Sequence, residues 1–283
     1  YSIFPFKKPY ARVPITFLIH SPIPCVDVEI EGVKSLFGID LRSSSSLRIR
    51  NELLDKWSKK ASGKMIWRDI YGKKNYAQTY LIDHIKMAKV KIVKTIARKE
   101  EIKEAIHRST FWKRSSEQEK EIVTNLSGLI GGKILSTYGL LLDFNHSHFF
   151  LVRNPTALKK EGYILEKFTE VPFEVNENGI ILSFDTNIGI KKFVLDSISY
   201  YSLLKKSVLQ DSESPANLSL EFNLGGGNHD NVEFRPLEGP VFEDVDGLLG
   251  MSFLVKHMIY LDFKGKKAKI LPSSTIDTWL KYN

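Results

Sequence analysis

Residues 128–144 read GLIGGKILSTYGLLLDF, and residues 247–263 read GLLGMSFLVKHMIYLDF. The two stretches align without a gap at an offset of 119 residues and share 7 of 17 positions, so we interpret them as an internal repeat. Solenoids generally need three or more copies of a repeat, whereas two copies indicate one structural unit that has been duplicated. The sequence therefore predicts two related lobes within one chain.

Other landmarks of the first half recur in the same order in the second half. An apolar strand pattern closes on a carboxylate in each half: LFGID ends at Asp40, and KFVLD ends at Asp196. Small polar residues follow each aspartate, and a segment with helical spacing comes next. The landmarks that pair in this way are Val13-Pro14 with Val171-Pro172, Gly32 with Gly189, residues 43–46 with residues 197–202, and residues 47–60 with residues 203–209.

The composition bounds the class of protein. A chain of 283 residues with 42% hydrophobic residues can bury two cores of ordinary size, and it has no apolar run near the length of about 18 residues that a membrane span requires. The net charge of +8 suits an anionic partner. However, the lysines of residues 86–103 alternate with apolar residues, which is typical of the solvated face of an antiparallel hairpin. We therefore expect no nucleic-acid partner and no membrane span.

The compartment is left open by the sequence. Cys25 is the one cysteine, so the chain cannot form an internal disulfide, and its apolar surroundings predict a buried core thiol rather than a nucleophile. The chain begins at Tyr1 rather than Met, which agrees with an exported protein whose signal peptide has been removed. We expect a monomer.

A long β-hairpin is predicted within the first half, over about residues 64–85. Two alternating apolar runs, residues 65–70 and 76–85, flank the turn-forming YGKKN at residues 71–75. Gly72 can take the positive φ that such a turn requires.

These patterns resemble the aspartic peptidases, and the retropepsin-like families most closely. The apolar strands that end in Asp40 and Asp196 carry the resemblance, together with the later G-L-x-G and L-D-F elements of each half. The resemblance covers residues 13–150 and 171–271 and implies an all-β, bilobal fold with pseudo-twofold symmetry. It also implies an N-terminal lobe over residues 1–152, a connection over residues 153–170 and a C-terminal lobe over residues 171–283.

The same resemblance implies a catalytic dyad. In that family one aspartate from each lobe reaches a shared centre, where two carboxyl groups hold one proton between them and activate a water molecule. By position, Asp40 and Asp196 are the dyad, and the mechanism needs neither a metal nor another cofactor. The hairpin tip, at Tyr71, Gly72, Lys73 and Lys74, corresponds to a flap that closes over an extended peptide or protein substrate.

Both loops depart from the family motif, Asp-Thr/Ser-Gly. The first loop reads Asp40-Leu41-Arg42-Ser43, and the second reads Asp196-Ser197-Ile198-Ser199. The hydroxyl that clamps the two loops together in the family is present at Ser197 and absent at Leu41. Arg42 and Ile198 replace the glycines, and a guanidinium pointing into the centre would favour two ionised carboxylates. Two interpretations stay open: a peptidase with altered loops, or an inactive scaffold that binds peptides or proteins.

Other candidate sites are weaker. His146 and His148 are spaced as a metal pair on a strand, but the matching positions in the second half are Gly265 and Lys267, which predicts a solvated hairpin turn. Asp143 and Asp262, the aspartates of the repeated L-D-F, are expected to have a turn or hydrogen-bonding role. Asp27 and Asp185 are expected to face outward. The predicted core residues are Leu129, Leu135, Leu248, Phe253 and Leu254, with short helices near residues 133–138 and 252–257.

Overall fold

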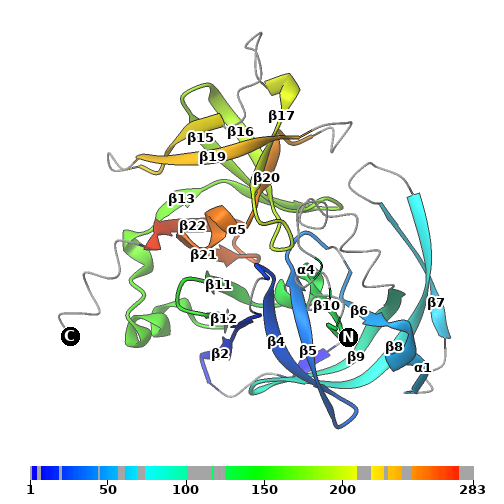
Figure 1. Ribbon diagram of the computed structural model, residues 1–283. Coiled ribbons are helices and arrows are strands. Elements are labelled where there is room, and N and C mark those ends of the chain that lie inside the picture. Colours follow the sequence, from blue (N-terminus) through cyan, green and yellow to red (C-terminus); the bar gives the residue numbers. More distant parts are fainter. Residues whose placement is uncertain are drawn as a thin grey trace.

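The computed structural model describes most of the chain. The described residues are 2–4, 8–18, 21–43, 45–56, 61–68, 74–100, 117, 121, 125–208, 218–225, 229–237 and 244–273. Strands form almost all of the regular structure, and they build two lobes with a shared sheet between them (Figure 1). The predicted all-β, bilobal fold is confirmed.

The first lobe is built on a nine-stranded sheet in the order β1-β9-β6-β10-β5-β4-β8-β7, with β3 paired to β4. Pairing between β8 and β9 curls this sheet into a barrel-like shape. The strands are β1 (Ser2–Phe4), β3 (Thr16–Phe17), β4 (Pro24–Ile30), β5 (Val33–Asp40), β6 (Leu47–Arg50), β7 (Ala61–Arg68), β8 (Lys74–Met87), β9 (Val90–Glu100) and β10 (Gly128–Gly131).

The second lobe repeats this plan in a seven-stranded sheet, in the order β14-β15-β16-β20-β17-β19-β18. Pairing between β15 and β18 closes it in the way that β4 and β8 pair in the first lobe. The strands are β14 (Phe173–Asn176), β15 (Gly179–Thr186), β16 (Gly189–Leu195), β17 (Ser202–Lys205), β18 (Leu218–Asn223), β19 (His229–Leu237) and β20 (Gly247–Leu249).

A six-stranded antiparallel sheet joins the lobes and takes three strands from each half of the chain. Its order is β13-β22-β21-β11-β12-β2. The strands are β2 (Tyr10–Pro14), β11 (Gly139–Asp143), β12 (His148–Val152), β13 (Thr169–Val171), β21 (His257–Asp262) and β22 (Lys267–Pro272). Val13 pairs with Phe149, and Val171 pairs with Ala268, which is 119 residues beyond Phe149. The two Val-Pro landmarks of the sequence are therefore structurally equivalent.

The pseudo-twofold axis passes through the centre of this sheet. There β11 pairs with β21, and Leu141 lies opposite Tyr260. Since 141 + 119 = 260, each of these residues faces its own counterpart in the repeat. The neighbouring pairs, Leu140 with Leu261 and Leu142 with Ile259, exchange places under the same offset. The sequence repeat is therefore also the structural repeat, and the two copies meet face to face.

The repeated G-L-x-G element is the inner strand of each lobe. β10 runs parallel to β5 on one side and antiparallel to β6 on the other, and β20 lies in the same way between β16 and β17. Close contacts explain its glycines. A Cβ atom at Gly131 would lie 1.9 Å from the carbonyl oxygen of Ser45, and one at Gly250 would lie 2.4 Å from that of Tyr201.

Helices are short and few in the described part of the chain. α4 (Gly132–Leu135) and α5 (Met251–Leu254) follow the two inner strands and begin one residue earlier than predicted. The prediction of helices directly after the two small polar clusters was wrong in part. Strands β6 and β17 come first, and only then α1 (Asn51–Lys56) and the short 3-10 helix η4 (Lys206–Val208).

The segment between the lobes contains two further 3-10 helices, η2 (Pro155–Glu161) and η3 (Leu165–Lys167). They connect β12 to β13, which lies at the opposite edge of the shared sheet, and Leu158 and Leu165 belong to one apolar cluster with residues of that sheet.

The predicted hairpin is present as β7 and β8, which pair antiparallel from Ala61 with Tyr80 to Arg68 with Lys74. Its turn residues Tyr71, Gly72 and Lys73 lie outside the described residues. The second lobe has no counterpart of β7 among its described strands, because the pairings of β18 and β19 match those of β8 and β9. Among the described strands, the hairpin is thus a feature of the first lobe alone.

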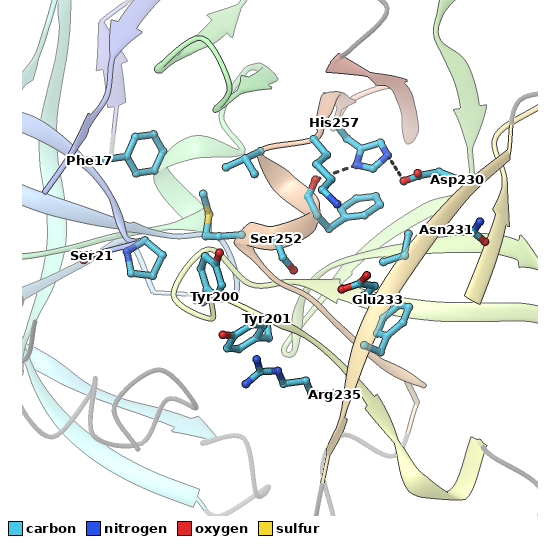
Figure 2. A pocket seen from close by; sticks show the side chains of 17 residues that line it. Phe17, Ser21, Tyr200, Tyr201, Asp230, Asn231, Glu233, Arg235, Ser252 and His257 are labelled. Carbon is cyan, nitrogen blue, oxygen red and sulfur yellow. Dashed lines mark hydrogen bonds and ion pairs between the residues drawn. The ribbon is translucent and has the colours of Figure 1, made fainter. Parts of the chain in front are cut away.

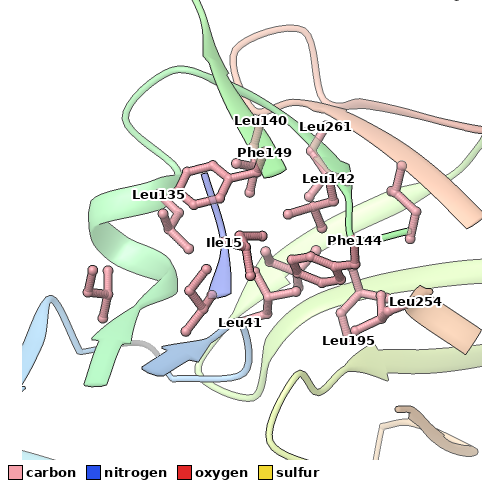
Figure 3. Packing of buried hydrophobic residues seen from close by; sticks show 14 of the residues in the cluster. Ile15, Leu41, Leu135, Leu140, Leu142, Phe144, Phe149, Leu195, Leu254 and Leu261 are labelled. Carbon is pink, nitrogen blue, oxygen red and sulfur yellow. The ribbon is translucent and has the colours of Figure 1, made fainter. Parts of the chain in front are cut away.

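One hydrophobic core runs from the first lobe through the shared sheet into the second lobe (Figure 3). Leu41 and Leu195, which flank the two Asp loops, lie in this core together with Leu135 and Leu254. The five predicted core residues Leu129, Leu135, Leu248, Phe253 and Leu254 are all buried. Burial of a side chain of this size contributes about 1.5–3 kcal/mol to folding, so the core ties the lobes together.

We predict that Gly131→Ala destabilises the protein by about 3 kcal/mol, because the new methyl group overlaps the Ser45 carbonyl and the loop after Asp40 has to move. Gly189→Ala is the control: a Cβ there meets nothing within 4 Å, although its φ of 92° adds a backbone cost of about 1–2 kcal/mol. Urea unfolding of both variants measures the difference. Equal losses would show that close packing at β10 is not what requires the glycine.

Candidate functional site

The two Asp loops lie at the ends of equivalent strands. Asp40 is the last residue of β5 and lies opposite Gly131 of the inner strand. Asp196 follows β16 directly, and its N–H donates to the carbonyl of Leu249, the residue before Gly250. Each aspartate is 3% exposed. Each Asp loop therefore begins at the same point along the inner strand of its lobe, because the strand before the loop runs parallel to that inner strand.

The Ser197 hydroxyl joins the two loops across the lobes. It donates to the carbonyl of Ile39 at 2.6 Å and accepts from the N–H of Leu41 at 3.0 Å. These two residues flank Asp40, so the hydroxyl next to Asp196 holds the Asp40 loop directly. The reciprocal clamp is absent because Leu41 has no hydroxyl; its side chain is fully buried in the core instead.

Backbone donors reach both carboxylates although the glycines of the family motif are replaced. Asp40 Oδ1 accepts from the N–H of Arg42 at 3.2 Å and from that of Ser43 at 3.1 Å. Asp196 Oδ1 accepts from the N–H of Ile198 at 3.0 Å, and its Oδ2 accepts from the Ser199 hydroxyl at 2.8 Å. The larger side chains at positions 42 and 198 thus leave these hydrogen bonds intact.

Two arginines complete the surroundings of the carboxylates. Arg42 crosses from the first lobe, with its Nε 3.4 Å from Asp196 Oδ2, so its side chain points toward the centre rather than away from it. Arg48 on β6 forms an ion pair with Asp40 Oδ2 and is itself buried. Each aspartate is therefore paired with a guanidinium.

Sequence reasoning missed Arg48. Residues 47–50 read LRIR, and their assignment to a helix left Arg48 without a defined direction. In β6 the side chains of Leu47, Arg48 and Ile49 are all buried, and a buried arginine requires an acidic partner. The signal that the sequence offered for this ion pair was an arginine in the segment that follows the Asp40 loop.

The two residues that stand in place of the motif glycines, Arg42 and Ile198, fill space between the lobes. Arg42 lies against the turn between β14 and β15, where a Cβ on Gly179 would lie 2.8 Å from the Arg42 carbonyl oxygen. Gly179 has a φ of 116°, so both its conformation and this contact require glycine there. In the opposite direction, Ile198 packs into an apolar cluster whose other buried members, Ile23, Cys25, Leu126 and Leu129, belong to the first lobe.

The donor set limits the chemistry of the two carboxylates. A protonated carboxyl group needs an acceptor for its proton, whereas an ionised carboxylate only accepts. The partners described above for Asp40 and Asp196 are backbone N–H groups and guanidinium groups, which only donate, and the Ser199 hydroxyl, which can donate or accept. One guanidinium group thus lies beside each carboxylate.

Of the predicted flap residues, only Lys74 lies within the described part of the chain. It begins β8 and is exposed. Ser43, the last of the four residues read for the first Asp loop, has a structural contact as well, because its carbonyl accepts from the Gly132 N–H at 2.8 Å. Ser199 makes the equivalent bond to Met251, which is 119 residues beyond Gly132.

The histidines after β11 belong to a buried polar network rather than to a solvated turn. The prediction of a solvated turn was wrong for His148, which is 5% exposed and lies 2.7 Å from the Tyr163 hydroxyl through its Nε2. Tyr163 donates to Asp143 Oδ2 at 2.6 Å, and His146 Nδ1 lies 2.9 Å from Asp143 Oδ1. Burial lowers the pKa of His148 and raises that of Tyr163.

This network explains the repeated L-D-F aspartates. Asp143 also accepts from the His146 N–H, and Asp262 accepts from the N–H groups of Lys264 and Gly265, so the predicted turn role of both aspartates is confirmed. No group of three or more His, Cys, Asp or Glu side chains in the described ranges is arranged to hold a metal ion.

The remaining sequence candidates are structural. Cys25 is fully buried, and burial raises the pKa of its thiol to about 12, as expected for a core residue. Asp27 and Asp185 are exposed, as predicted.

A cavity of about 530 Å³ that the sequence did not predict lies beside α5 (Figure 2). Its walls come from β19, α5 and Tyr200–Tyr201 of the second lobe, with Phe17, Ser21 and Pro22 of the first lobe at one end. In its wall, buried His257 lies 3.0 Å through its Nε2 from Asp230 Oδ2, and this contact lowers the pKa of Asp230.

Comparison with known proteins supports the fold. No protein-family model and no curated protein sequence matches the chain. Among solved structures, basic 7S globulin from soybean has a TM-score of 0.61 at 8% identity, covering 95% of this chain and 96% of that one. Conglutin gamma, a basic 7S globulin from lupine seeds, has a TM-score of 0.60 at 8% identity, covering 96% and 97%. An aspartic proteinase from Irpex lacteus has a TM-score of 0.54 at 13% identity, covering 94% and 98%.

At these identities the likeness concerns the fold alone: the chain has the architecture of an aspartic proteinase over nearly its whole length. None of the described helices has the length and apolar character needed to cross a membrane.

We predict that Ser197→Ala costs about 2 kcal/mol of stability, because it leaves the Leu41 N–H and the Ile39 carbonyl without their buried partner. Ser197→Thr retains the hydroxyl and should lose less than about 1 kcal/mol. Urea unfolding of the three proteins measures this difference, and equal losses for the two variants would assign the effect to volume rather than to the interlobe hydrogen bonds.

We predict that Arg48→Met destabilises the protein by about 3–5 kcal/mol, because it leaves the Asp40 carboxylate buried without its charged partner. Asp40→Asn in the same chain should recover a large part of that loss, since the amide carries no charge. A double-mutant cycle from urea unfolding gives the coupling energy. Additive effects of the two changes would mean that this ion pair does not stabilise the loop.

Proposed function

We propose that this protein binds an extended peptide or a protein segment in the cleft between its lobes and does not hydrolyse it. The observation that carries the proposal is the pairing of each aspartate with an arginine, Asp40 with Arg48 and Asp196 with Arg42. Peptide hydrolysis by an aspartate dyad requires one carboxyl group as the acid and the other as the base. Two carboxylates that each face a guanidinium do not divide these roles.

Geometry around the carboxylates also supports a non-catalytic role. The side chains of Asp40 and Asp196 are each 4% exposed, and Arg42 lies against Asp196 from the opposite lobe with 23% of its side chain exposed. Arg42 thus occupies space beside the carboxylate that it neutralises. An attacking water would need to displace this side chain and then lose a proton to a carboxylate already stabilised by positive charge.

Peptide binding rests on the architecture that the chain retains. The fold of an aspartic proteinase spans the chain, and the first lobe adds the β7–β8 hairpin at the place where the sequence resemblance puts a flap. A hairpin over a cleft adds backbone hydrogen bonds to an extended ligand. A protein that only binds a peptide needs these features, whereas the shared proton is needed only for hydrolysis.

Hydrolysis is the second candidate, and the Asp196 loop favours it. Asp196 keeps a backbone donor from Ile198 and a hydroxyl donor from Ser199, and Ser197 keeps the clamp to the opposite loop. If Arg42 moved away when a peptide binds, this half of the site would be available for chemistry. The two candidates therefore differ in whether Arg42 leaves Asp196.

An unbiased peptide library, incubated with the protein from pH 3 to 8 and read by mass spectrometry, separates the two candidates. We expect no cleavage above that of the Asp40→Asn/Asp196→Asn variant at any pH. Peptides retained by the immobilised protein should bind Asp196→Asn within about twofold, since the ligand contacts lie outside the buried carboxylates.

Cleavage that disappears in the double variant would overturn the proposal in favour of a peptidase. A library from which neither protein retains any peptide would rule out the binding role.

A further inference from the structure

One edge of β19 is open among the strands that the structure describes. β18 pairs with β19 along His229–Phe234, whereas β17, on the other side, pairs only with residues 234–237. Residues 229–233 therefore have a described neighbour on one side only. Asn231 and Glu233 in this stretch are exposed.

The hydrogen bonds of Glu221 show which backbone groups face the open edge. Glu221 is the β18 residue opposite Asn231. Its N–H donates to the Asn187 side chain at 3.2 Å, and its carbonyl accepts from the Asn187 N–H at 3.1 Å, so both groups point away from β19. In an antiparallel pair of strands, the N–H and C=O groups of two opposite residues either all point at the partner strand or all point away from it. The N–H and C=O of Asn231 thus point to the open edge, and by alternation those of Glu233 do as well.

The cavity beside α5 lies along this edge. Its lining includes every residue of β19 from Asp230 to Arg235. Because successive side chains of a strand point to opposite faces, a cavity that touches six in a row lies against the edge of the strand rather than over one face. Figure 2 shows Asp230, Asn231 and Glu233 on this strand, with α5 across the cavity from them.

The first lobe shows what such an edge accepts. Ile49 and Leu204 are equivalent, because they pair with Gly128 and Gly247 of the repeat. Their partners on the neighbouring strand are Lys99 and Pro236, so positions on β9 and β19 correspond at an offset of 137. β1 pairs antiparallel with Lys91, Ile92 and Val93 of β9, and Val93 corresponds to Asp230. In the first lobe an extended strand thus lies along the start of the edge whose equivalent in the second lobe, at His229 and Asp230, has no described neighbour.

We propose that the open edge of β19 binds an extended peptide segment of a partner protein, which adds to the sheet as a strand and places one apolar side chain in the cavity. The backbone groups of Asn231 and Glu233 supply the hydrogen bonds of this strand addition. The site is separate from the Asp loops and does not depend on the function proposed for them.

The cavity defines the chemistry of the bound side chain. Its volume of about 530 Å³ is within the range of sites for small ligands and suits a large aliphatic or aromatic side chain. Phe17, Met251, Phe253 and Val255 contribute apolar surface. Several charged lining residues have partners within the protein, because His257 is paired with Asp230 and the Arg235 guanidinium lies 3.1 Å from the centre of the Tyr201 ring. Glu233 and Lys256, which also line the cavity, carry opposite charges. An uncharged apolar anchor is therefore favoured over an ionised one.

A displayed library of random octapeptides, panned on the intact protein, supplies the probe. The best peptide is synthesised with a fluorescent label, and its affinity is measured by anisotropy. We expect Asn231→Pro, which removes the N–H at the open edge, to weaken binding about tenfold, and Asn231→Ala, which keeps that N–H, to stay within about twofold of the parent.

N-methylation of the peptide gives a test that needs no protein variant. Methyl groups at alternate backbone nitrogens should abolish binding, and those at the intervening nitrogens should have little effect, because a strand donates to its neighbour at every second residue. Failure to enrich any octapeptide, equal binding to Asn231→Pro, or no alternation would overturn the proposal. The proposal would also be overturned if the protein associates with itself and Asn231→Pro abolishes that association, since the edge would then be occupied by a second copy of the chain.

Discussion

The pairing of β11 with β21 is the constraint on which the rest of the structure depends. It places Leu141 opposite Tyr260, so each copy of the repeat meets its own counterpart at the centre of the shared sheet. Since both lobes are attached to this sheet through equivalent strands, their inner strands and Asp loops face each other across the same axis. The Ser197 hydroxyl then fixes the two loops at hydrogen-bonding distance. Leu41 and Ser197, which are 156 positions apart in the chain, are hydrogen-bonded neighbours for this reason.

Around that axis the backbone is nearly symmetric, whereas the side chains are not. The bonds of Ser43 to Gly132 and of Ser199 to Met251 correspond across the repeat. By contrast, the guanidinium that pairs with Asp40 comes from its own lobe, and the one that pairs with Asp196 comes from the other lobe. The two acids thus occupy equivalent places in the fold, whereas both of the guanidinium groups that pair with them come from the first lobe.

Much of this could be read from the sequence, because backbone architecture leaves periodic and repeated patterns. The repeat at residues 128–144 and 247–263 predicted the two lobes, and strand patterns ending in Asp40 and Asp196 predicted the two loops. Arg48 was missed because four residues of β6 are too short to distinguish a strand from a helix by periodicity. The direction of Arg42 depends on packing across the lobes, with Gly179 on the other side, and no local pattern encodes it. The buried state of His148 depends on Tyr163, which lies 15 residues further along the chain.

The unlike residues at positions 42 and 198 bear on the relation between the two halves. Ile198 enters an apolar cluster of the first lobe, and Arg42 reaches a carboxylate of the second lobe. A symmetric pair of first halves would bring two guanidinium groups to one centre, where like charges repel. A symmetric pair of second halves would place two isoleucines, and no counterpart of Arg42, beside two buried carboxylates. The residues at positions 42 and 198 therefore suit an arrangement in which a first half faces a second half.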